Sequence, residues 1–181
     1  REARISVNGK IAQTAKGGQV IRLDRKWSNH DEIRLTLPME VALEKFSENS
    51  ISVERGPLVY ALKIDEHWEK IKNNDTYGDY FEVYPKSPWN YGLLATNSKN
   101  GQQNFTFDKK QMSETPWNID HAPVEIHAMA VQLPDWKMYN GNSGPLPYSP
   151  QPMPVNEKPV SVTLIPYGCT TLRISEFPEV E

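Results

Sequence analysis

The feature that most constrains the fold is a two-residue alternation of apolar and polar side chains. In residues 33–37 the apolar side chains of Ile33, Leu35 and Leu37 fall on alternate positions, and residues 160–164 repeat the pattern. Successive side chains of a strand point to opposite faces, so this pattern predicts antiparallel strands with one face in water. No helical stretch is long enough to define an α-domain. Fifteen prolines spread among short strands are typical of a β-sandwich.

Turn signals divide the first third of the chain into short strands. Asn8 and Gly9 supply the positive φ angles that a tight hairpin turn prefers. Gly56 and Pro57 predict a break between two further strands, because proline cannot donate a hydrogen bond within a central ladder. The strands expected in this part cover residues 4–7, 20–25, 33–37, 51–54 and 58–64, with 20–25 as the expected partner of the first hairpin.

The sequence changes character after residue 64, where we predict a domain boundary. Residues 65–79 are charged and rich in turn formers, although 66–72 could instead form two helical turns. Residues 134–159 hold seven prolines and no periodicity, which predicts a long irregular loop. The strands expected after the boundary cover residues 80–84, 105–107, 124–133, 160–165 and 171–174. We therefore predict an all-β, jelly-roll-like antiparallel fold of two sandwich units, residues 1–64 and 65–181.

Composition excludes several classes of partner. The net charge of −3 and a pI near 5.9 come without the clustered Lys and Arg that a nucleic-acid surface needs. No apolar run approaches the roughly 18 residues that span a bilayer. The single cysteine, Cys169, can form neither an internal disulfide nor a Cys-rich metal site. We expect Cys169 to be a small buried hydrophobic residue.

The sequence nominates no catalytic residue. It lacks a Gly-x-Ser-x-Gly elbow, a His-Glu-x-x-His motif and a phosphate-binding loop. Glu125 and His127 would share one face of an extended strand, so a two-ligand metal edge is one alternative. A metal site requires three or four converging ligands, and no third is indicated. We therefore predict no metal site and interpret both residues as a solvent-facing strand surface.

Aromatic side chains are the only candidates for ligand binding. Trp89 and Tyr91 are the candidates for carbohydrate binding, because aromatic faces stack on sugar rings. The alternative is that these residues plug one end of a sandwich or bury a domain contact. Trp27 and Trp68 are interpreted as core or interface. Other aromatic residues in or beside loops are Trp117, Trp136, Tyr139 and Tyr148.

Several motifs together carry a family resemblance. At these motifs the chain resembles the C-terminal β-sandwich region of bacterial glycoside hydrolase family 127, the β-L-arabinofuranosidase-like proteins formerly described as a domain of unknown function. The similarity extends over nearly the whole chain. The matching residues are 6–9 with 27–38, 54–60, 82–93, 164–173 and 177–178.

The resemblance implies a parent protein with an (α/α)6 barrel followed by two β-sandwich domains. It places a cysteine nucleophile, a glutamate acid/base and a zinc ion held by cysteines and glutamate on that barrel. None of these motifs has a counterpart here, so the resemblance implies no catalytic residue, metal ligand or cofactor for this chain. The strand that the family places before the Val-Asn-Gly hairpin is missing from this sequence. The first sandwich is therefore expected to be incomplete, or completed by something outside this chain.

Three functions stay open, in this order. The first is a non-catalytic accessory region that supports the missing barrel or mediates homodimer contacts. The second is a carbohydrate-binding module that uses Trp89 and Tyr91. The third is an independent enzyme. The resemblance implies plant-derived, arabinose-containing glycans as the parent's substrates and favours a periplasmic or extracellular location, which the residues themselves do not encode.

Overall fold

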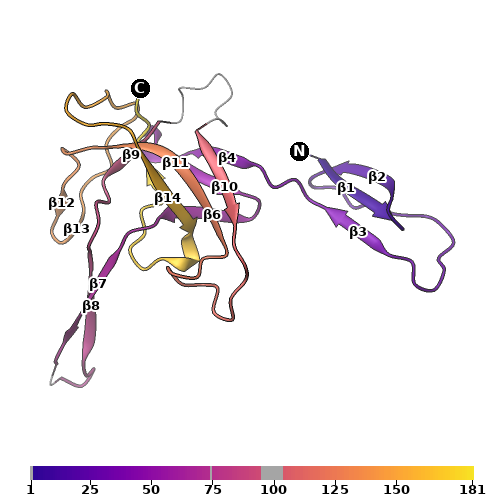
Figure 1. Ribbon diagram of the computed structural model, residues 1–181, viewed down its shortest axis with the longest axis horizontal. Helices are drawn as coiled ribbons and strands as arrows, with labels where there is room; N and C mark the ends of the chain where they lie inside the picture. Colours follow the sequence, from indigo (N-terminus) through magenta and orange to yellow (C-terminus); the bar gives the residue numbers. More distant parts are fainter. Residues whose placement is uncertain (1, 74, 95–103) are drawn as a thin grey trace. The chain divides into compact units, whose positions relative to one another are not determined.

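The computed structural model describes residues 2–73, 75–94 and 104–181, and within them it is built from strands (Figure 1). The predicted all-β antiparallel fold is confirmed. In the described residues the helical elements are two short 3-10 turns, η1 (Ser47–Asn49) and η2 (Tyr167–Cys169). The chain divides into two compact units, Arg1–Glu40 and Val41–Glu181.

The first unit is a three-stranded sheet in the order β2-β1-β3, formed by β1 (Glu2–Val7), β2 (Lys10–Lys16) and β3 (Ile33–Thr36). Asn8 and Gly9 have φ angles of 51° and 78°, which confirms the predicted tight hairpin turn. The predicted partner strand at residues 20–25 is wrong, because the chain there is irregular and β2 pairs with β1 instead. A two-residue turn fixes the register, so the residues directly after it must form the partner strand.

One face of this small sheet is apolar and only partly covered. Ile5 and Val7 are buried, and their partners on β3, Leu35 and Ile33, are each 55% exposed. Asp31 holds the chain that leads into β3. Its carboxylate accepts hydrogen bonds from the Asn8 side chain (2.7 Å) and from the backbone N–H of Ser28 (2.9 Å).

The second unit is organised around one eight-stranded sheet, in which the path β10-β11-β14-β6-β5-β15 is extended by β4 beside β5 and β9 beside β11. Gly56, at φ 60°, begins the turn that separates β5 from β6, as the sequence predicted. The strands are β4 (Val41–Lys45), β5 (Ile51–Arg55), β6 (Leu58–Leu62), β9 (Tyr91–Leu93), β10 (Phe105–Lys109), β11 (Val124–Gln132), β14 (Val160–Pro166) and β15 (Glu176–Phe177).

The sheet places the division of the chain earlier than the sequence did. Strands β4, β5 and β6 pair with the later strands β14 and β15, so residues 41–62 belong to the second unit. Along the chain, the boundary between the two compact units follows Glu40, whereas the sequence analysis put it after residue 64.

The C-terminal segment curls this sheet around its core. β15 pairs with β5, and three residues later Val180 donates its backbone N–H to the Leu93 carbonyl of β9 (3.0 Å). Leu93 in turn donates to the carbonyl of Pro178 (2.8 Å). Residues 176–180 thus link the β5 side of the sheet to the β9–β11 side. The enclosed core contains Ile51, Val53, Tyr60, Leu62, Ile64, Leu93, Ile126, Ala128, Ala130, Val162, Leu164 and Phe177.

Two hairpins lie outside this sheet. β7 (Glu66–Ile71) and β8 (Tyr80–Pro85) form a two-stranded ribbon that extends away from the sheet of the second unit (Figure 1), so the helical alternative for residues 66–72 is wrong. β12 (Met138–Tyr139) and β13 (Asn142–Ser143) form a short hairpin inside the predicted loop 134–159. The strand predicted at 171–174 is also wrong. The backbone N–H groups of Thr171 and Leu172 bond to the Glu66 carboxylate, not to another strand.

Replacing Gly92 by alanine is expected to lower the free energy of unfolding by about 1–3 kcal/mol, because the new methyl group overpacks the core. Its Cβ would clash with Val180 Cγ2 and lie 3.2 Å from Leu133 Cδ1. Chemical denaturation measures the change. Gly17→Ala is the control, since a Cβ there meets nothing within 4 Å. A Gly92→Ala protein as stable as the Gly17→Ala control would contradict this packing.

The Asp31 contacts predict a pH dependence within the first unit. The hydrogen bond from the Ser28 backbone, followed by that from Asn8, lowers the pKa of Asp31 below its ordinary value of 3.8. A carboxyl group with a lowered folded pKa stabilises the fold above the unfolded pKa, and this contribution is lost as the pH falls through the folded pKa. An NMR titration should show the Asn8 side-chain amide shifting below pH 3.8. The shift should disappear in Asp31→Ala and persist in Asp24→Ala; a midpoint above that value would refute the assignment.

Candidate functional site

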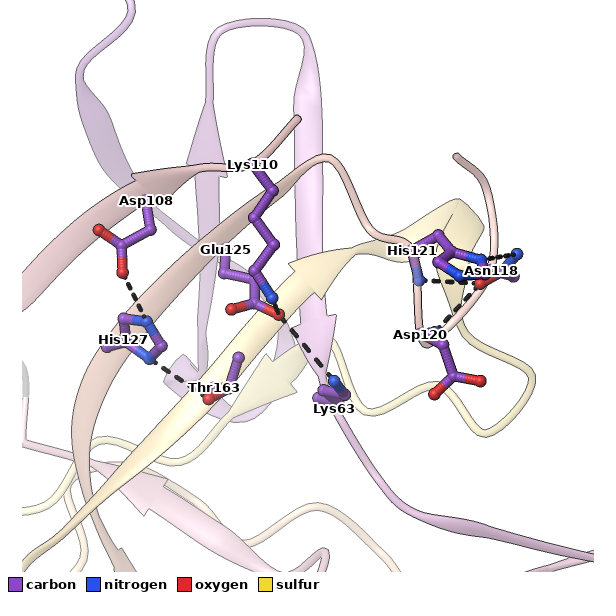
Figure 2. Close-up of polar contacts among 9 residues, drawn as sticks. All are labelled: Lys63, Asp108, Lys110, Asn118, Asp120, His121, Glu125, His127 and Thr163. Atoms are coloured by element: carbon purple, nitrogen blue, oxygen red, sulfur yellow. Dashed lines mark hydrogen bonds and ion pairs between the residues drawn. The ribbon is translucent and has the colours of Figure 1, made fainter. Parts of the chain in front are cut away.

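A row of polar side chains crosses the outer face of three neighbouring strands. Glu125 and His127 lie on β11 on either side of Ile126, which is fully buried in the core. His127 is opposite Thr163 of β14, and Glu125 is opposite Asp108 of β10. Figure 2 shows the side chains of Asp108 and Thr163 facing His127, and the Glu125 carboxylate facing Lys110 and Lys63. The predicted shared strand face of Glu125 and His127 therefore exists, and the sheet adds neighbours that the sequence alone did not identify.

Glu125 is held between two lysines. Its residue is only 7% exposed, and its Oε1 lies 2.5 Å from Lys110 Nζ and 4.0 Å from Lys63 Nζ. A carboxylate at this depth needs charged partners to offset the cost of leaving water. The two ammonium groups supply them, so Glu125 is engaged in a local ion cluster.

His127 connects a carboxylate to a hydroxyl. Its Nε2 lies 3.0 Å from Asp108 Oδ2, and its Nδ1 lies 3.3 Å from Thr163 Oγ1. A hydroxyl, an imidazole and a carboxylate in this order have the chemistry of a nucleophile, its base and an orienting group. Thr163 lines neither of the two grooves described below. A substrate would have to bind on an open sheet face, which makes this arrangement a weak candidate for catalysis.

The polar row does not fit a metal ion. The Glu125 carboxylate is paired with ammonium groups that would repel a cation, and His127 has contacts on both ring nitrogens. In residues 2–73, 75–94 and 104–181 no group of three or more His, Cys, Asp and Glu side chains is arranged to hold a metal. His121 lies apart from the row and contacts Asn118, as Figure 2 shows.

Trp89 lies in a groove beside the two hairpins. The groove has a volume of about 300 Å³, within the lower part of the size range of small-ligand sites. Trp89 packs edge-to-face against the buried Trp136, with ring centroids 5.1 Å apart. The other residues that line the groove are Ile64, Val83, Tyr84, Pro85, Met138, Gly141, Asn142, Ser143, Thr171, Leu172, Arg173 and Ile174.

Tyr91 lies outside the groove that Trp89 lines. It lies on β9 against the core, and the groove is not lined by it. Burial, and secondarily the charge of Glu157, raises the pKa of Tyr91. Of the two aromatic residues proposed together from the sequence, only Trp89 therefore lines this groove.

Hydrogen bonds fix one wall of the groove. Asn90 donates from its Nδ2 to the carbonyls of Leu133 (2.8 Å) and Trp136 (3.1 Å), and Gln132 donates to Asn90 Oδ1. The Trp136 indole N–H donates to the Gly144 carbonyl (3.1 Å). The segment that carries Trp89 is thus tied to the strand end and the loop behind it.

Glu66 fixes the opposite wall. Its Oε1 accepts the backbone N–H groups of Thr171 (3.0 Å) and Leu172 (3.3 Å), and its Oε2 accepts the Trp68 indole N–H (2.9 Å). Sequence reasoning missed Asn90 and Glu66. The partners of Asn90 at Leu133 and Trp136, and those of Glu66 at Thr171 and Leu172, are distant along the chain, and no local pattern reports such contacts.

A second groove, of about 340 Å³, lies beside Trp117 and Tyr167 and is lined mainly by apolar residues of the β5–β6 turn and η2. The remaining aromatic candidates lie elsewhere: Trp136 is buried, and Tyr139 and Tyr148 are exposed. Trp27 and Trp68 are about half exposed, so neither belongs to the core. Cys169 is buried, as expected, and burial raises the pKa of its thiol.

Comparisons with known proteins return no match. No protein-family model, no curated protein and no solved structure is similar enough to this chain to be identified as a relative. In the part of the chain that the structure describes, no helix has the length and hydrophobicity to cross a bilayer. The functional argument therefore depends on the grooves, the polar row and the exposed surfaces described above.

The Glu125 cluster predicts that substitutions of Lys110 and Glu125 have coupled effects on the free energy of unfolding. Lys110→Met should lower the free energy of unfolding by about 1–2 kcal/mol, because it leaves a buried carboxylate with only the more distant Lys63. Adding Glu125→Gln should recover part of the loss, since the uncompensated charge is gone. Urea denaturation of the two single variants and the double variant measures the coupling. Lys109→Met, one residue away and outside the cluster, is the control, and purely additive effects would argue against the ion cluster.

Proposed function

We propose that this chain is the non-catalytic C-terminal β-sandwich region of a glycoside hydrolase that resembles the β-L-arabinofuranosidases. In this role it supports the catalytic (α/α)6 barrel of an enzyme that acts on arabinofuranoside-containing plant glycans. The observation that carries the proposal is the ribbon β7–β8, whose two faces both present large apolar side chains to solvent.

The ribbon has the properties of a docking element. Trp68 (51% exposed) and Phe81 (56% exposed) lie on one face, edge-to-face with ring centroids 5.9 Å apart. Tyr80 and Tyr84 lie on the other face and are also exposed. A lone two-stranded ribbon is marginally stable in water, and contiguous exposed apolar surface marks protein interfaces. Packing against another domain would stabilise this ribbon.

A second domain explains the ribbon better than a second copy of the chain. Two copies related by a two-fold axis would present the same patch to each other and would cover one face of each ribbon. The exposed aromatic residues occupy both faces. A depression on a larger domain can receive the ribbon and cover both faces at once.

The positions of the motifs are compatible with a framework role. Residues 54–60 span the end of β5, the turn and the start of β6, where Tyr60 is fully buried. Residues 164–173 end β14 and include η2, and Phe177 with Pro178 takes part in curling the sheet. These three motif segments therefore belong to the framework of the second unit and lie outside the polar row.

The accessory role predicts the behaviour of the complete protein. The reading frame that contains this chain should also encode an (α/α)6 barrel, and Trp68→Ser with Phe81→Ser should lower the thermal stability of that whole enzyme. Trp117→Ser is the matched control. It replaces an exposed tryptophan that lies outside the ribbon and should have little effect on thermal stability. Differential scanning calorimetry checks the result. A reading frame without a barrel would refute the proposal.

The purified chain should also fail to hydrolyse p-nitrophenyl L-arabinofuranosides. Hydrolysis that is abolished by His127→Ala would instead favour an independent enzyme that uses the polar row. We expect the wild-type chain to be inactive and the ribbon variant of the whole enzyme to be destabilised.

A further inference from the structure

We infer that the groove beside Trp89 binds one uncharged sugar residue. This inference goes beyond the accessory role, because a domain that only supports a barrel needs no ligand groove. It rests on the groove's combination of an aromatic ring, unpaired hydrogen-bonding groups and a lining without an available charge.

Trp89 provides the apolar surface. Its contact with Trp136 and the hydrogen bonds of the neighbouring Asn90 hold the ring in place before any ligand arrives. A rigid, partly exposed aromatic ring is suited to the C–H face of a sugar, because little side-chain freedom is lost on binding. Among the described residues Trp89 has no hydrogen-bond partner for its indole N–H.

The polar groups lie on the rim formed by the β12–β13 hairpin and the segment after η2. The hydroxyls of Ser143 and Thr171 have no hydrogen-bond partner in the described residues, and Asn142 makes one long bond of 3.3 Å, to the Asn140 carbonyl. The backbone N–H groups of this rim at Thr171 and Leu172 are already taken by Glu66. Side-chain hydroxyl and amide groups are thus the recognition groups, which suits a polyhydroxylated ligand.

The charge of the lining favours a neutral ligand. Arg173 is the one charged residue that lines the groove. Its Nε donates to the Thr170 carbonyl (3.1 Å), and its guanidinium lies 4.9 Å from the centroid of the Tyr167 ring. Thr170 and Tyr167 do not line the groove, so these two contacts draw the guanidinium away from it. No other charged residue of the lining could pair with a carboxylate or a phosphate. A volume of about 300 Å³ accommodates one sugar ring, not an extended oligosaccharide.

An NMR titration of the folded chain tests this inference. The probes are the methyl glycosides of L-arabinofuranose, D-xylopyranose and D-galactopyranose, with D-galacturonate as the charged comparison. The indole N–H resonance of Trp89, identified by its loss in Trp89→Phe, should shift and saturate in the millimolar range with at least one neutral glycoside. Asn142→Ala with Ser143→Ala should raise the Kd about fivefold to tenfold.

Trp117→Ala is the control, because it removes an exposed tryptophan from the second groove and should leave the Kd unchanged. Three results would overturn the inference: no saturable shift of Trp89 with any neutral glycoside, binding of galacturonate alone, or binding that Trp117→Ala abolishes and the Asn142/Ser143 double variant does not affect. A negative result would leave the accessory role intact, since the ribbon variants test that role independently.

Discussion

The second unit depends on the hydrogen-bonded ladder β11–β14–β6–β5. These four strands carry fully buried side chains at Ile126, Leu164, Tyr60 and Val53. Because a strand alternates its faces, fixing these residues in the core also fixes which residues face outward. The positions of Glu125, His127 and Thr163 on the outer face follow directly from that register. The polar row is thus a consequence of how the core packs, and its ion pairs stabilise an arrangement that the core has already set.

The grooves and the ribbon are built at the margins of this ladder, where local contacts matter more. Glu66 lies at the base of the ribbon and bonds to both the backbone after η2 and the Trp68 indole. One carboxylate therefore joins the docking ribbon to a wall of the Trp89 groove. A partner that moved the ribbon would act on the groove through this side chain, which gives the two proposed roles a physical connection.

The sequence predicted the parts of the fold that local patterns encode. The two-residue period identified β3 and β14, a short apolar segment identified β11, and the Asn8-Gly9 pair located the first hairpin. Several of the missed strands have weak patterns: β2 is almost wholly exposed, β7 lies in a charged segment, and β9, β12, β13 and β15 are only two or three residues long. Of the candidate site, Trp89 could be named from its residue type. Its neighbours on the β12–β13 hairpin and after η2 could not, because tertiary contacts bring them together.

The closing role of residues 176–180 affects how the protein must be made. Strands β5 and β9 are synthesised early, yet the segment that links their two sides of the sheet is among the last residues described. Domains emerge from the ribosome N-terminal end first, and unpaired strand edges favour association between chains. The curled sheet can close only after synthesis has passed residue 180, so residues 51–52 of β5 and the free edge of β9 stay without these partners on the nascent chain until then. This unit is therefore expected to fold only after its own last strand has been synthesised, and to need protection from aggregation until then.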